Sequence, residues 1–375
     1  MLEVSRKDIK HIALFVPSLT GGGAERVMIT LAKEFSRRGF KVDILVITTS
    51  GPYLKEVPDT VNLINLNRSR VLFSVFKLAR YMRKERPDVL MSTMNHVNVV
   101  AIISGLISFS PVKVIVREAI TATTEFKASD KLADKVILRL LKLLYPRASN
   151  IICPSQGIAK DLEIKLSIPK DKLKVIYNPL DIKHISLLAA ENALHPWVEA
   201  GENIILGVGR LAKQKGFDTL VTAFSVVREC SDVPVKLIIL GEGEDRDILQ
   251  DHIDKLGLQD CVDLPGFIDN PYAFIRYAKC YVLSSLWEGL PNVLIQALAL
   301  GTPAVATDCP SGPVEILESG KWGELVSMSQ PEEMASAILR VLSKAENNNS
   351  LTKKYCEEKF GLERIANEYL HVLNS

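Results

Sequence analysis

Short apolar runs alternate with longer amphipathic segments along most of the chain. An apolar run at 12–16 leads through a glycine-rich loop into 24–38, where apolar residues recur every three or four positions until Gly39 ends the helical pattern. Further runs of strand character lie at 42–47, 61–66, 89–91, 113–116, 150–152 and 174–176. Strands separated by amphipathic helices form parallel sheets with helices on both faces, so the pattern predicts a doubly wound α/β domain.

The same alternation starts again near residue 203. Predicted strands lie at 203–208, 235–240, 262–264, 280–283 and 303–306, and predicted helices at 216–228, 246–256, 271–277 and 291–300. Two successive units of this kind predict two Rossmann-like domains.

The boundary between the domains falls within 178–201, where the periodicity fades and Pro179, Pro196 and Gly201 appear. We expect residues 1–180 to form the first domain and residues 181–359 the second. From residue 332 onward the pattern is helical, and we expect the last helix, at about 360–375, to pack back on the first domain.

Composition and charge narrow the picture. With 375 residues, of which 47% are apolar, the chain is long enough for two buried cores. The net charge is only +2, but residues 1–180 carry 29 Lys and Arg against 16 Asp and Glu, whereas the rest carries 17 against 28. The basic half suits an anionic surface, such as a membrane or a phosphorylated acceptor, and mutual attraction of the two halves is the alternative.

The cysteines and the apolar runs indicate a cytoplasmic protein. The six cysteines form no C-x-x-C pair and several lie in strand-like runs, which is typical of small buried residues in a reducing compartment. The first ten residues lack the apolar core of a signal peptide. The apolar run at 97–109 is too short to span a bilayer and predicts a buried helix.

Ligands of open parallel sheets bind beyond the carboxyl ends of the strands, so the loops after the strands carry the candidate chemistry. Residues 18–26 follow the first strand and contain Gly21, Gly22 and Gly23 just before a helix, where backbone N–H groups can approach phosphate. The segment matches neither G-x-G-x-x-G nor a Walker loop. A turn without a ligand is the alternative.

Residues 207–216 hold the corresponding place in the second domain. Arg210 and Lys215 follow Gly209 and flank the next predicted helix. An arginine can bind a diphosphate through two parallel hydrogen bonds and a lysine adds a point charge, so this position favours phosphate binding over two solvated cations.

A third loop, at 286–296, combines an acid with a helix start. Pro291 suits the first helical position, and the N–H groups of Gly289 and Leu290 just before it can face an anion. Glu288 lies in the same turn. Gln296 is the one polar residue of an otherwise apolar helix, and its amide needs either neighbouring backbone or a sugar or ribose hydroxyl as a partner.

Other polar residues near strand ends are weaker candidates. Arg117 and Glu118 end one first-domain strand, and Asn95 and His96 follow another; for His96 alone a structural role is the preferred interpretation. Residues 241–243 form a short glycine loop that suits a nucleotide. The D-x-D pattern at 245–247 opens a helix, where acids are favoured in any case, so it gives little support to a metal site.

Four segments in this order resemble the retaining glycosyltransferases of family 4, whose members have the GT-B fold. They are GGGAER at 21–26, GVGRLAKQKG at 207–216, LGEGEDR at 240–246 and SSLWEGLPNVLIQALALGTPAVATD at 284–308. The resemblance covers nearly the whole chain. It implies two Rossmann-like domains facing across an active-site cleft, with the C-terminal helix on the first. The segment 309–315 resembles enzymes of surface-polysaccharide and glycan-precursor assembly.

The resemblance also implies roles for individual residues. Arg210 and Lys215 match the pair that binds the donor diphosphate, and Glu288 matches the first acid of the E-x7-E motif, which holds sugar hydroxyls and supports the transition state. Gln296 stands where the family has a second acid that binds the ribose. The implied catalytic residues are Glu288, Arg210, Lys215 and Glu118. The implied donor-binding residues are Gly22, Gly23, Gly209, Gly241, Phe267, Gly289, Leu290, Pro291, Asn292 and Gln296. The implied acceptor side is Asn95, His96 and Arg117.

The implied reaction transfers a hexose or N-acetylhexosamine from a nucleotide-sugar, in the first place a UDP-sugar, to a glycan on polyprenyl diphosphate with retention at the anomeric carbon. The nucleotide-sugar is a co-substrate, and we expect no cofactor, no metal and no nucleic acid partner. Cationic amphipathic stretches at 72–86 and 136–147 suit an anionic cytoplasmic leaflet, and ordinary core-facing helices with solvated cations are the alternative.

Two other classes compete with the transferase. An NAD-dependent oxidoreductase would need G-x-G-x-x-G with an acid about twenty residues on, and neither domain has it. A sugar-nucleotide-binding protein of the same fold, with epimerase or no activity, is the second alternative, and Gln296 motivates it.

Overall fold

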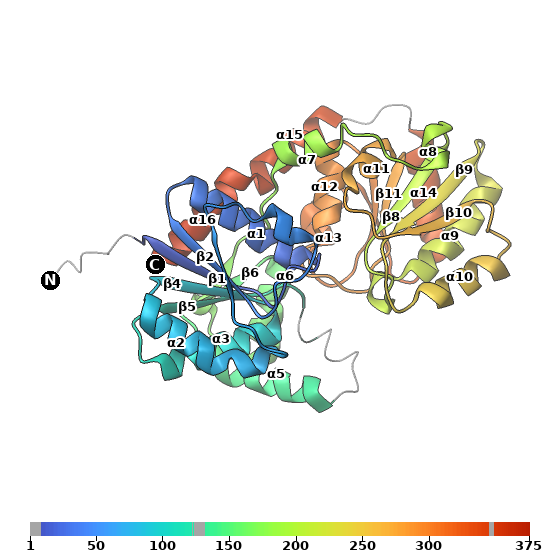
Figure 1. Ribbon diagram of the computed structural model, residues 1–375. Helices are drawn as coiled ribbons and strands as arrows, with labels where there is room; N and C mark the ends of the chain where they lie inside the picture. The colour runs from blue at the N-terminus through green and yellow to red at the C-terminus, as the bar shows by residue number, and fades with distance from the viewer. Residues whose placement is uncertain (1–8, 122, 124–131, 345–348) are drawn as a thin grey trace. The chain divides into compact units, whose positions relative to one another are not determined.

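The computed structural model describes residues 9–121, 123, 132–344 and 349–375 and separates into two compact units (Figure 1). Unit 1 combines Met1–Pro179 with Leu362–Ser375, and unit 2 is Leu180–Gly361. The sequence pattern placed the same divisions at 180 and about 360. Residues 1–8, on which most of the expectation about a signal peptide rests, lie outside the described residues.

Unit 1 is built on a seven-stranded parallel sheet of order β3-β2-β1-β4-β5-β6-β7. Its strands are β1 (His11–Phe15), β2 (Lys41–Val46), β3 (Asn62–Asn65), β4 (Val89–Thr93), β5 (Lys113–Arg117), β6 (Asn150–Cys153) and β7 (Leu173–Val175). Most strand residues are buried, because helices cover both faces and alternate side chains enter two separate cores.

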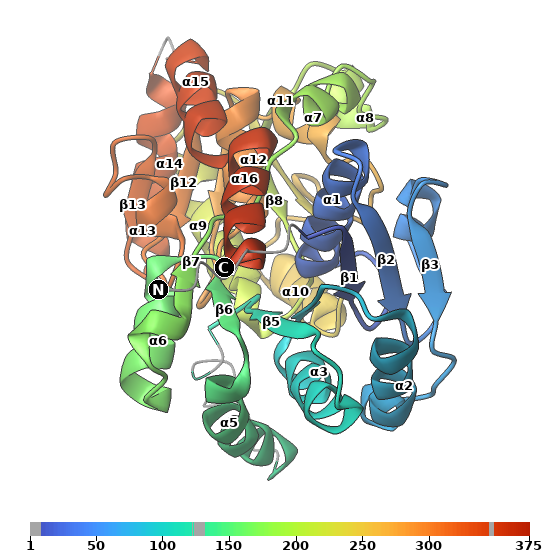
Figure 2. The ribbon, with the colours of Figure 1, turned by 90° about the vertical axis from the view of Figure 1, so that its left-hand side faces the viewer.

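The helices of unit 1 form two layers. On one face, α2 (Val75–Glu85), α3 (Asn95–Ser108), α5 (Leu132–Leu144) and α6 (Gln156–Leu166) share a core with the sheet. On the other face lie α1 (Gly23–Arg37) and the C-terminal helix α16 (Leu362–Asn374). Figure 2 shows α2, α3 and α5 together on one side of the strands. The prediction that the last helix packs on the first domain is confirmed, because Ile365, Tyr369 and Leu373 are buried in its core.

Unit 2 repeats the architecture with a six-stranded parallel sheet of order β10-β9-β8-β11-β12-β13. Its strands are β8 (Asn203–Val208), β9 (Val235–Leu240), β10 (Val262–Gly266), β11 (Cys280–Leu283), β12 (Ala304–Thr307) and β13 (Glu324–Val326). One core joins this sheet to α9 (Phe217–Cys230), α10 (Arg246–Lys255) and α14 (Pro331–Ser343). The two doubly wound parallel sheets confirm the predicted fold class.

Two features of unit 2 differ from the sequence pattern. The region around 178–201, where periodicity fades, contains the short helices α7 (Ile182–Leu188) and α8 (Pro196–Glu199). Strand β13, of three residues, was not predicted. Of the remaining helices, α11 (Tyr272–Tyr277), α12 (Asn292–Leu300), α13 (Pro313–Ile316) and α15 (Asn349–Phe360), the last packs on α12.

The cysteines and the apolar helices follow the expectations with one exception. All six cysteines are free thiols; five of them are buried as expected, but Cys230 is exposed at the end of α9. The apolar run at 97–109 lies largely in the buried helix α3. Within the described part of the chain, no helix has the length and apolar character needed to cross a membrane.

Candidate active site

The loops after β8, β11 and β12 lie at one edge of the unit 2 sheet, because these strands are parallel neighbours. We call residues 209–216, 284–291 and 307–313 the strand-end cluster. It contains Arg210, Lys215 and Glu288. Although up to 78 positions separate these residues in the sequence, they follow parallel strands that end at the same edge of the sheet, so they are predicted to lie close together.

Glu288 and Lys215 form an ion pair within this cluster. The Nζ atom of Lys215 lies 2.6 Å from Oε1 of Glu288, and the two side chains are 20% and 8% exposed. The same Oε1 atom accepts a hydrogen bond of 2.7 Å from the hydroxyl of Ser285. Burial, reinforced by the nearby Glu288 carboxylate, raises the pKa of the Cys309 thiol to about 12. A neutral thiol and an ion-paired carboxylate therefore lie side by side at these strand ends.

Arg210 lies in the same loop as Lys215, is exposed, and has no ion-pair partner among the described residues. Two glycines give the loop its path. A Cβ on Gly209 would lie 3.1 Å from the side chain of Lys215, and one on Gly241, where φ is +143°, would lie 1.8 Å from the carbonyl oxygen of Gly209. The loop after β9 packs so closely against the loop after β8 that only a residue without a Cβ fits at position 241. The exposed cation remains available to an anion.

Three hydrogen bonds join the loop carrying Lys215 to the loop carrying Glu288. The backbone N–H of Leu286 donates to the carbonyl of Gln214 (2.8 Å), and the Gln214 amide donates to the carbonyl of Trp287 (2.8 Å). The hydroxyl of Ser284 donates to the carbonyl of Lys215 (2.7 Å). The two loops are therefore held together by backbone contacts as well as by the ion pair.

Helix α12 begins at Asn292, four residues after Glu288 and one residue later than predicted. Pro291 is its N-cap and Asn292 its first residue. Gly312, with φ +101°, lies against this start: a Cβ there would be 2.6 Å from Cδ of Pro291. Gln296 is 9% exposed and has no hydrogen-bond partner in the described part of unit 2. Within that part, neighbouring backbone groups therefore do not bond its amide, which was one of the two alternatives considered from the sequence.

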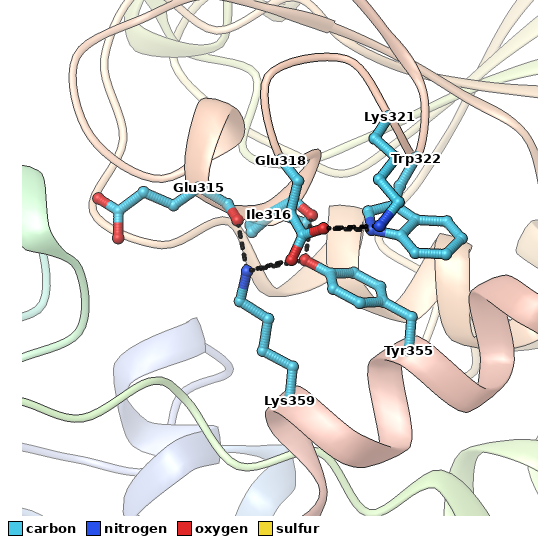
Figure 3. Close-up of polar contacts among 7 residues, drawn as sticks. All are labelled: Glu315, Ile316, Glu318, Lys321, Trp322, Tyr355 and Lys359. Atoms are coloured by element: carbon cyan, nitrogen blue, oxygen red, sulfur yellow. Dashed lines mark hydrogen bonds and ion pairs between the residues drawn. The ribbon is translucent and has the colours of Figure 1, made fainter.

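A second polar group supports the α13 side of the cluster (Figure 3). Lys359 of α15 donates to the carbonyl of Glu315 (2.9 Å) and pairs with Glu318 (3.3 Å). The Tyr355 hydroxyl donates to the carbonyl of Ile316 (2.6 Å). These donors satisfy carbonyls at the end of α13, and the carboxylate of Glu315 points away from them in Figure 3. Helix α15 thereby fixes the helix that follows the 307–313 loop.

In the glycine loop of unit 1, residues of the loop donate hydrogen bonds to the carboxylate of Glu25. Gly22 is the N-cap of α1, Gly23 is its first residue, and the Gly22 N–H donates to the Glu25 carboxylate (2.6 Å). The Ser18 hydroxyl donates to the same carboxylate (3.0 Å). Glu25 therefore already occupies a position that the helix dipole offers to an anion. The assignment of Gly22 and Gly23 to donor binding stays a prediction.

Arg117 has a structural place rather than the expected place on an acceptor surface. Its side chain is 1% exposed, and its guanidinium donates to Tyr369 of α16 (3.0 Å), to Thr93 of β4 (3.1 Å) and to Asn178. Asn178 directly precedes Pro179, the residue at which the chain leaves unit 1. Arg117 thus links both the segment at Asn178 and helix α16 to the sheet through hydrogen bonds.

Glu118 is also buried, although its position in the family pattern implied catalysis. It is 0% exposed, and the hydroxyl of Tyr145 donates to its carboxylate. Burial and the Glu118 carboxylate raise the pKa of Tyr145 well above its ordinary value, so the hydroxyl keeps its proton. Asn98 donates to the same hydroxyl (3.0 Å). Glu118 therefore belongs to an internal hydrogen-bond network of unit 1, and its catalytic role stays a prediction.

The remaining candidates divide between surface and interior. Asn95 is 7% exposed at the start of α3, and His96 next to it is exposed. Phe267 follows β10 and is 53% exposed, which leaves its ring accessible. The structure does not bring Phe267 into the hydrogen-bond network of the strand-end cluster, and its donor role stays a prediction.

Four polar residues of the cluster were missed from the sequence: Gln214, Ser284, Ser285 and Thr307. Ser284 and Ser285 form a hydroxyl doublet directly after a buried strand and before Glu288, and that position was the available signal. The hydrogen bonds of Gln214 to the second loop depend on the pairing order β8–β11, which sequence periodicity does not report.

Two family models match the chain. The model "Glycosyltransferase Family 4" matches residues 21–184, and the model "Glycosyl transferases group 1" matches residues 196–356. The two matches fall on the two units in turn.

Curated relatives match over most of their length. An uncharacterized glycosyltransferase of Methanocaldococcus jannaschii is 32% identical over 282 residues, which is 71% of this chain and 69% of the relative. A protein of Campylobacter jejuni is 28% identical over 379 residues, covering 96% of this chain and all of the relative. Its name is N-acetylgalactosamine-N,N'-diacetylbacillosaminyl-diphospho-undecaprenol 4-alpha-N-acetylgalactosaminyltransferase.

Solved structures share the fold at low sequence identity. The Anabaena protein HepE, solved in complex with UDP, superposes with a TM-score of 0.78 at 21% identity and covers 97% of this chain and 99% of its own. Sucrose-phosphate synthase from Thermosynechococcus elongatus gives a TM-score of 0.80 at 19% identity, covering 96% and 97%.

Proposed function

Because this chain belongs to family 4 of the glycosyltransferases and has their GT-B fold, we propose that it moves a hexose or N-acetylhexosamine from a UDP-sugar to a glycan carried on polyprenyl diphosphate. Glycosyl transfer itself follows from the family. The observation that carries the finer proposal is the Glu288–Lys215 ion pair at the strand ends of unit 2, together with the exposed Arg210 of the loop that carries Lys215.

The donor diphosphate is bound by Arg210 and Lys215. A guanidinium can form two parallel hydrogen bonds to a phosphate, and the ammonium of Lys215 has three N–H donors, of which Glu288 takes one. As the bond to the sugar breaks, negative charge develops on the leaving diphosphate, and both cations stabilise it. In this proposal the two side chains supply the charge that a divalent metal supplies in other phosphate sites.

Glu288 binds the hydroxyls of the transferred sugar. A carboxylate accepts hydrogen bonds only, so it suits hydroxyl donors, and its ion pair with Lys215 couples the sugar position to the diphosphate position. Transfer proceeds with retention: the acceptor hydroxyl attacks from the face that the diphosphate leaves, and a donor phosphate oxygen takes its proton.

The acceptor is proposed from the relatives. The Campylobacter jejuni protein is named for transfer to a diphospho-undecaprenol-linked sugar, and a second relative of the same organism, 24% identical over 377 residues, carries a similar name. We propose the same acceptor class here, because the match to the first relative covers 96% of this chain and the full length of the relative.

The test is turnover of UDP- and GDP-sugars with a polyprenyl-diphosphate-linked sugar as acceptor, together with UDP titration. Turnover of one UDP-sugar supports the proposal. Arg210→Ala is expected to weaken UDP binding about tenfold to a hundredfold, because an exposed phosphate-binding cation is lost. Arg276→Ala, at the end of α11, is the matched control. UDP binding without turnover of any donor would favour the nucleotide-sugar-binding protein instead.

An apolar and basic face of unit 1 suits a membrane that holds such an acceptor. Leu72, Phe73 and Phe76, at and before the start of α2, are 64%, 55% and 79% exposed. Arg70 and Arg80 are exposed next to them, and Arg80 lies one helical turn after Phe76 on the same side of α2. Exposed aromatic residues among cations bind anionic bilayers, so we propose that this face rests on the anionic cytoplasmic leaflet.

Vesicle co-sedimentation tests this face. The chain is expected to bind vesicles of phosphatidylglycerol and phosphatidylethanolamine in a salt-sensitive way, and the double substitution Phe73→Ser, Phe76→Ser is expected to weaken binding about tenfold or more. Ile164→Ser on α6 removes an apolar side chain that is 75% exposed elsewhere in unit 1 and serves as the control. Equal binding of all three chains would refute the membrane face.

A further inference from the structure

Ser285 contacts the proposed sugar-binding acid from the inside of unit 2. Its side chain is 1% exposed, and its hydroxyl donates to Oε1 of Glu288 at 2.7 Å. The ammonium of Lys215 approaches the same oxygen at 2.6 Å. One carboxylate oxygen therefore receives two donors, one from the buried side and one from a side chain that is 20% exposed.

The position of Ser285 is itself determined by the sheet. It follows β11 after one further residue, and its carbonyl accepts a hydrogen bond of 2.6 Å from the hydroxyl of Thr307 at the end of β12. Ser284 next to it donates to the carbonyl of Lys215. Two adjacent strands thus place the hydroxyl, whereas the carboxylate that it holds is on a loop.

The loop backbone does not depend on this hydroxyl. The N–H of Leu286 bonds to Gln214, the carbonyl of Trp287 accepts from the Gln214 amide, and the N–H of Glu288 donates to Pro310 at 3.2 Å. What the Ser285 hydroxyl adds is the direction of the carboxylate. A glutamate has three side-chain torsions, so a carboxylate that loses this donor can turn together with the flexible ammonium of Lys215.

We propose that Ser285 is a positioning residue of the transfer reaction, which holds the Glu288 carboxylate, and through it the Lys215 ammonium, in the orientation that the transition state requires. The inference rests on the proposed function, because it takes Glu288 as the acid that binds the sugar. Misplacing a group that acts in the transition state lowers kcat, whereas the affinity for the nucleotide depends on the cations and is largely kept.

The experiment compares Ser285→Ala with the wild-type chain in donor turnover and UDP titration. We expect kcat to fall about tenfold, with the KM of the donor and the Kd of UDP within about twofold of wild type, as the loss of one hydrogen bond to a charged group predicts. Ser285→Thr keeps the hydroxyl and is expected to recover most of kcat. If Ser285→Ala does not fold, Ser285→Cys keeps the size and offers only a weak donor, so the same loss is expected.

Thr302→Val is the matched control, because Thr302 is 3% exposed and its hydroxyl donates to the carbonyl of Ile275 (2.6 Å), away from the strand-end cluster. A merely structural role of Ser285 would lower the melting temperatures of both variants and leave both kcat values unchanged. A kcat of Ser285→Ala within twofold of wild type overturns the inference alone, provided that Glu288→Ala shows the large loss of kcat expected for the sugar-binding acid. A wild-type chain that turns over no donor overturns the proposed function and the inference together.

Discussion

Replacing Glu288 by alanine is expected to lower kcat by about a hundredfold to a thousandfold, which is the usual effect of removing one preorganised electrostatic group from an active site. UDP affinity is expected to stay within a few-fold of wild type or to rise slightly. The reason is that the carboxylate holds Lys215 at 2.6 Å, and its removal leaves the ammonium to the diphosphate. Steady-state kinetics and UDP titration measure the two effects separately.

The control for this substitution is Glu324→Ala. Glu324 is also a partly buried acid of unit 2 in ion pairs, with Arg340 and Lys344, but it lies at the start of β13 and not at the strand ends. Its removal is expected to leave kcat unchanged. A kcat of Glu288→Ala within about fivefold of wild type would show that this acid does not take part in the transfer.

Replacing Arg117 by alanine is expected to destabilise unit 1 by about 3 kcal/mol or more, because it opens a cavity and leaves buried oxygens of Tyr369, Thr93 and Asn178 without their donor. Urea unfolding followed by circular dichroism measures the loss. Arg83→Ala is the control: Arg83 also donates to backbone carbonyls of unit 1, but its side chain is exposed, so a change below about 1 kcal/mol is expected.

The same variant decides between the two interpretations of Arg117. A structural arginine lowers stability and leaves the acceptor KM of the folded protein unchanged. An arginine on the acceptor surface would raise the acceptor KM at unchanged stability, and that result would restore the interpretation taken from the sequence.

The candidate site shows where sequence reasoning is strong. Arg210, Lys215 and Glu288 were predicted because each follows a buried strand of a parallel sheet, and such strands end at one edge. Their ion pair was not predicted, since it depends on β8 lying next to β11 although five predicted elements separate these strands in the chain. The hydrogen bond from Ser285 to Glu288 lies within one loop and was not predicted either.

The error at Arg117 has a physical cause. Arg117 follows the same rule, because it lies at the end of β5, yet its side chain is only 1% exposed and is enclosed within unit 1. The rule gives the edge of the sheet at which a side chain lies, but not whether another element covers it. Here the covering group at Arg117 is Tyr369, which comes from a helix 252 residues away in the chain.

The sequence by itself determined the fold class, the two units and the return of the last helix. Hydrophobic periodicity predicts each helix and strand from nearby residues, and the order of these elements along the chain is enough to predict a parallel α/β fold. It also determined the family, because four motifs stand in one order. Only the tertiary structure decided which charged residues are accessible: it left Arg210 exposed, paired Lys215 with Glu288 and buried Arg117. Burial depends on packing between segments that are distant in the chain, and no local pattern of residues contains that information.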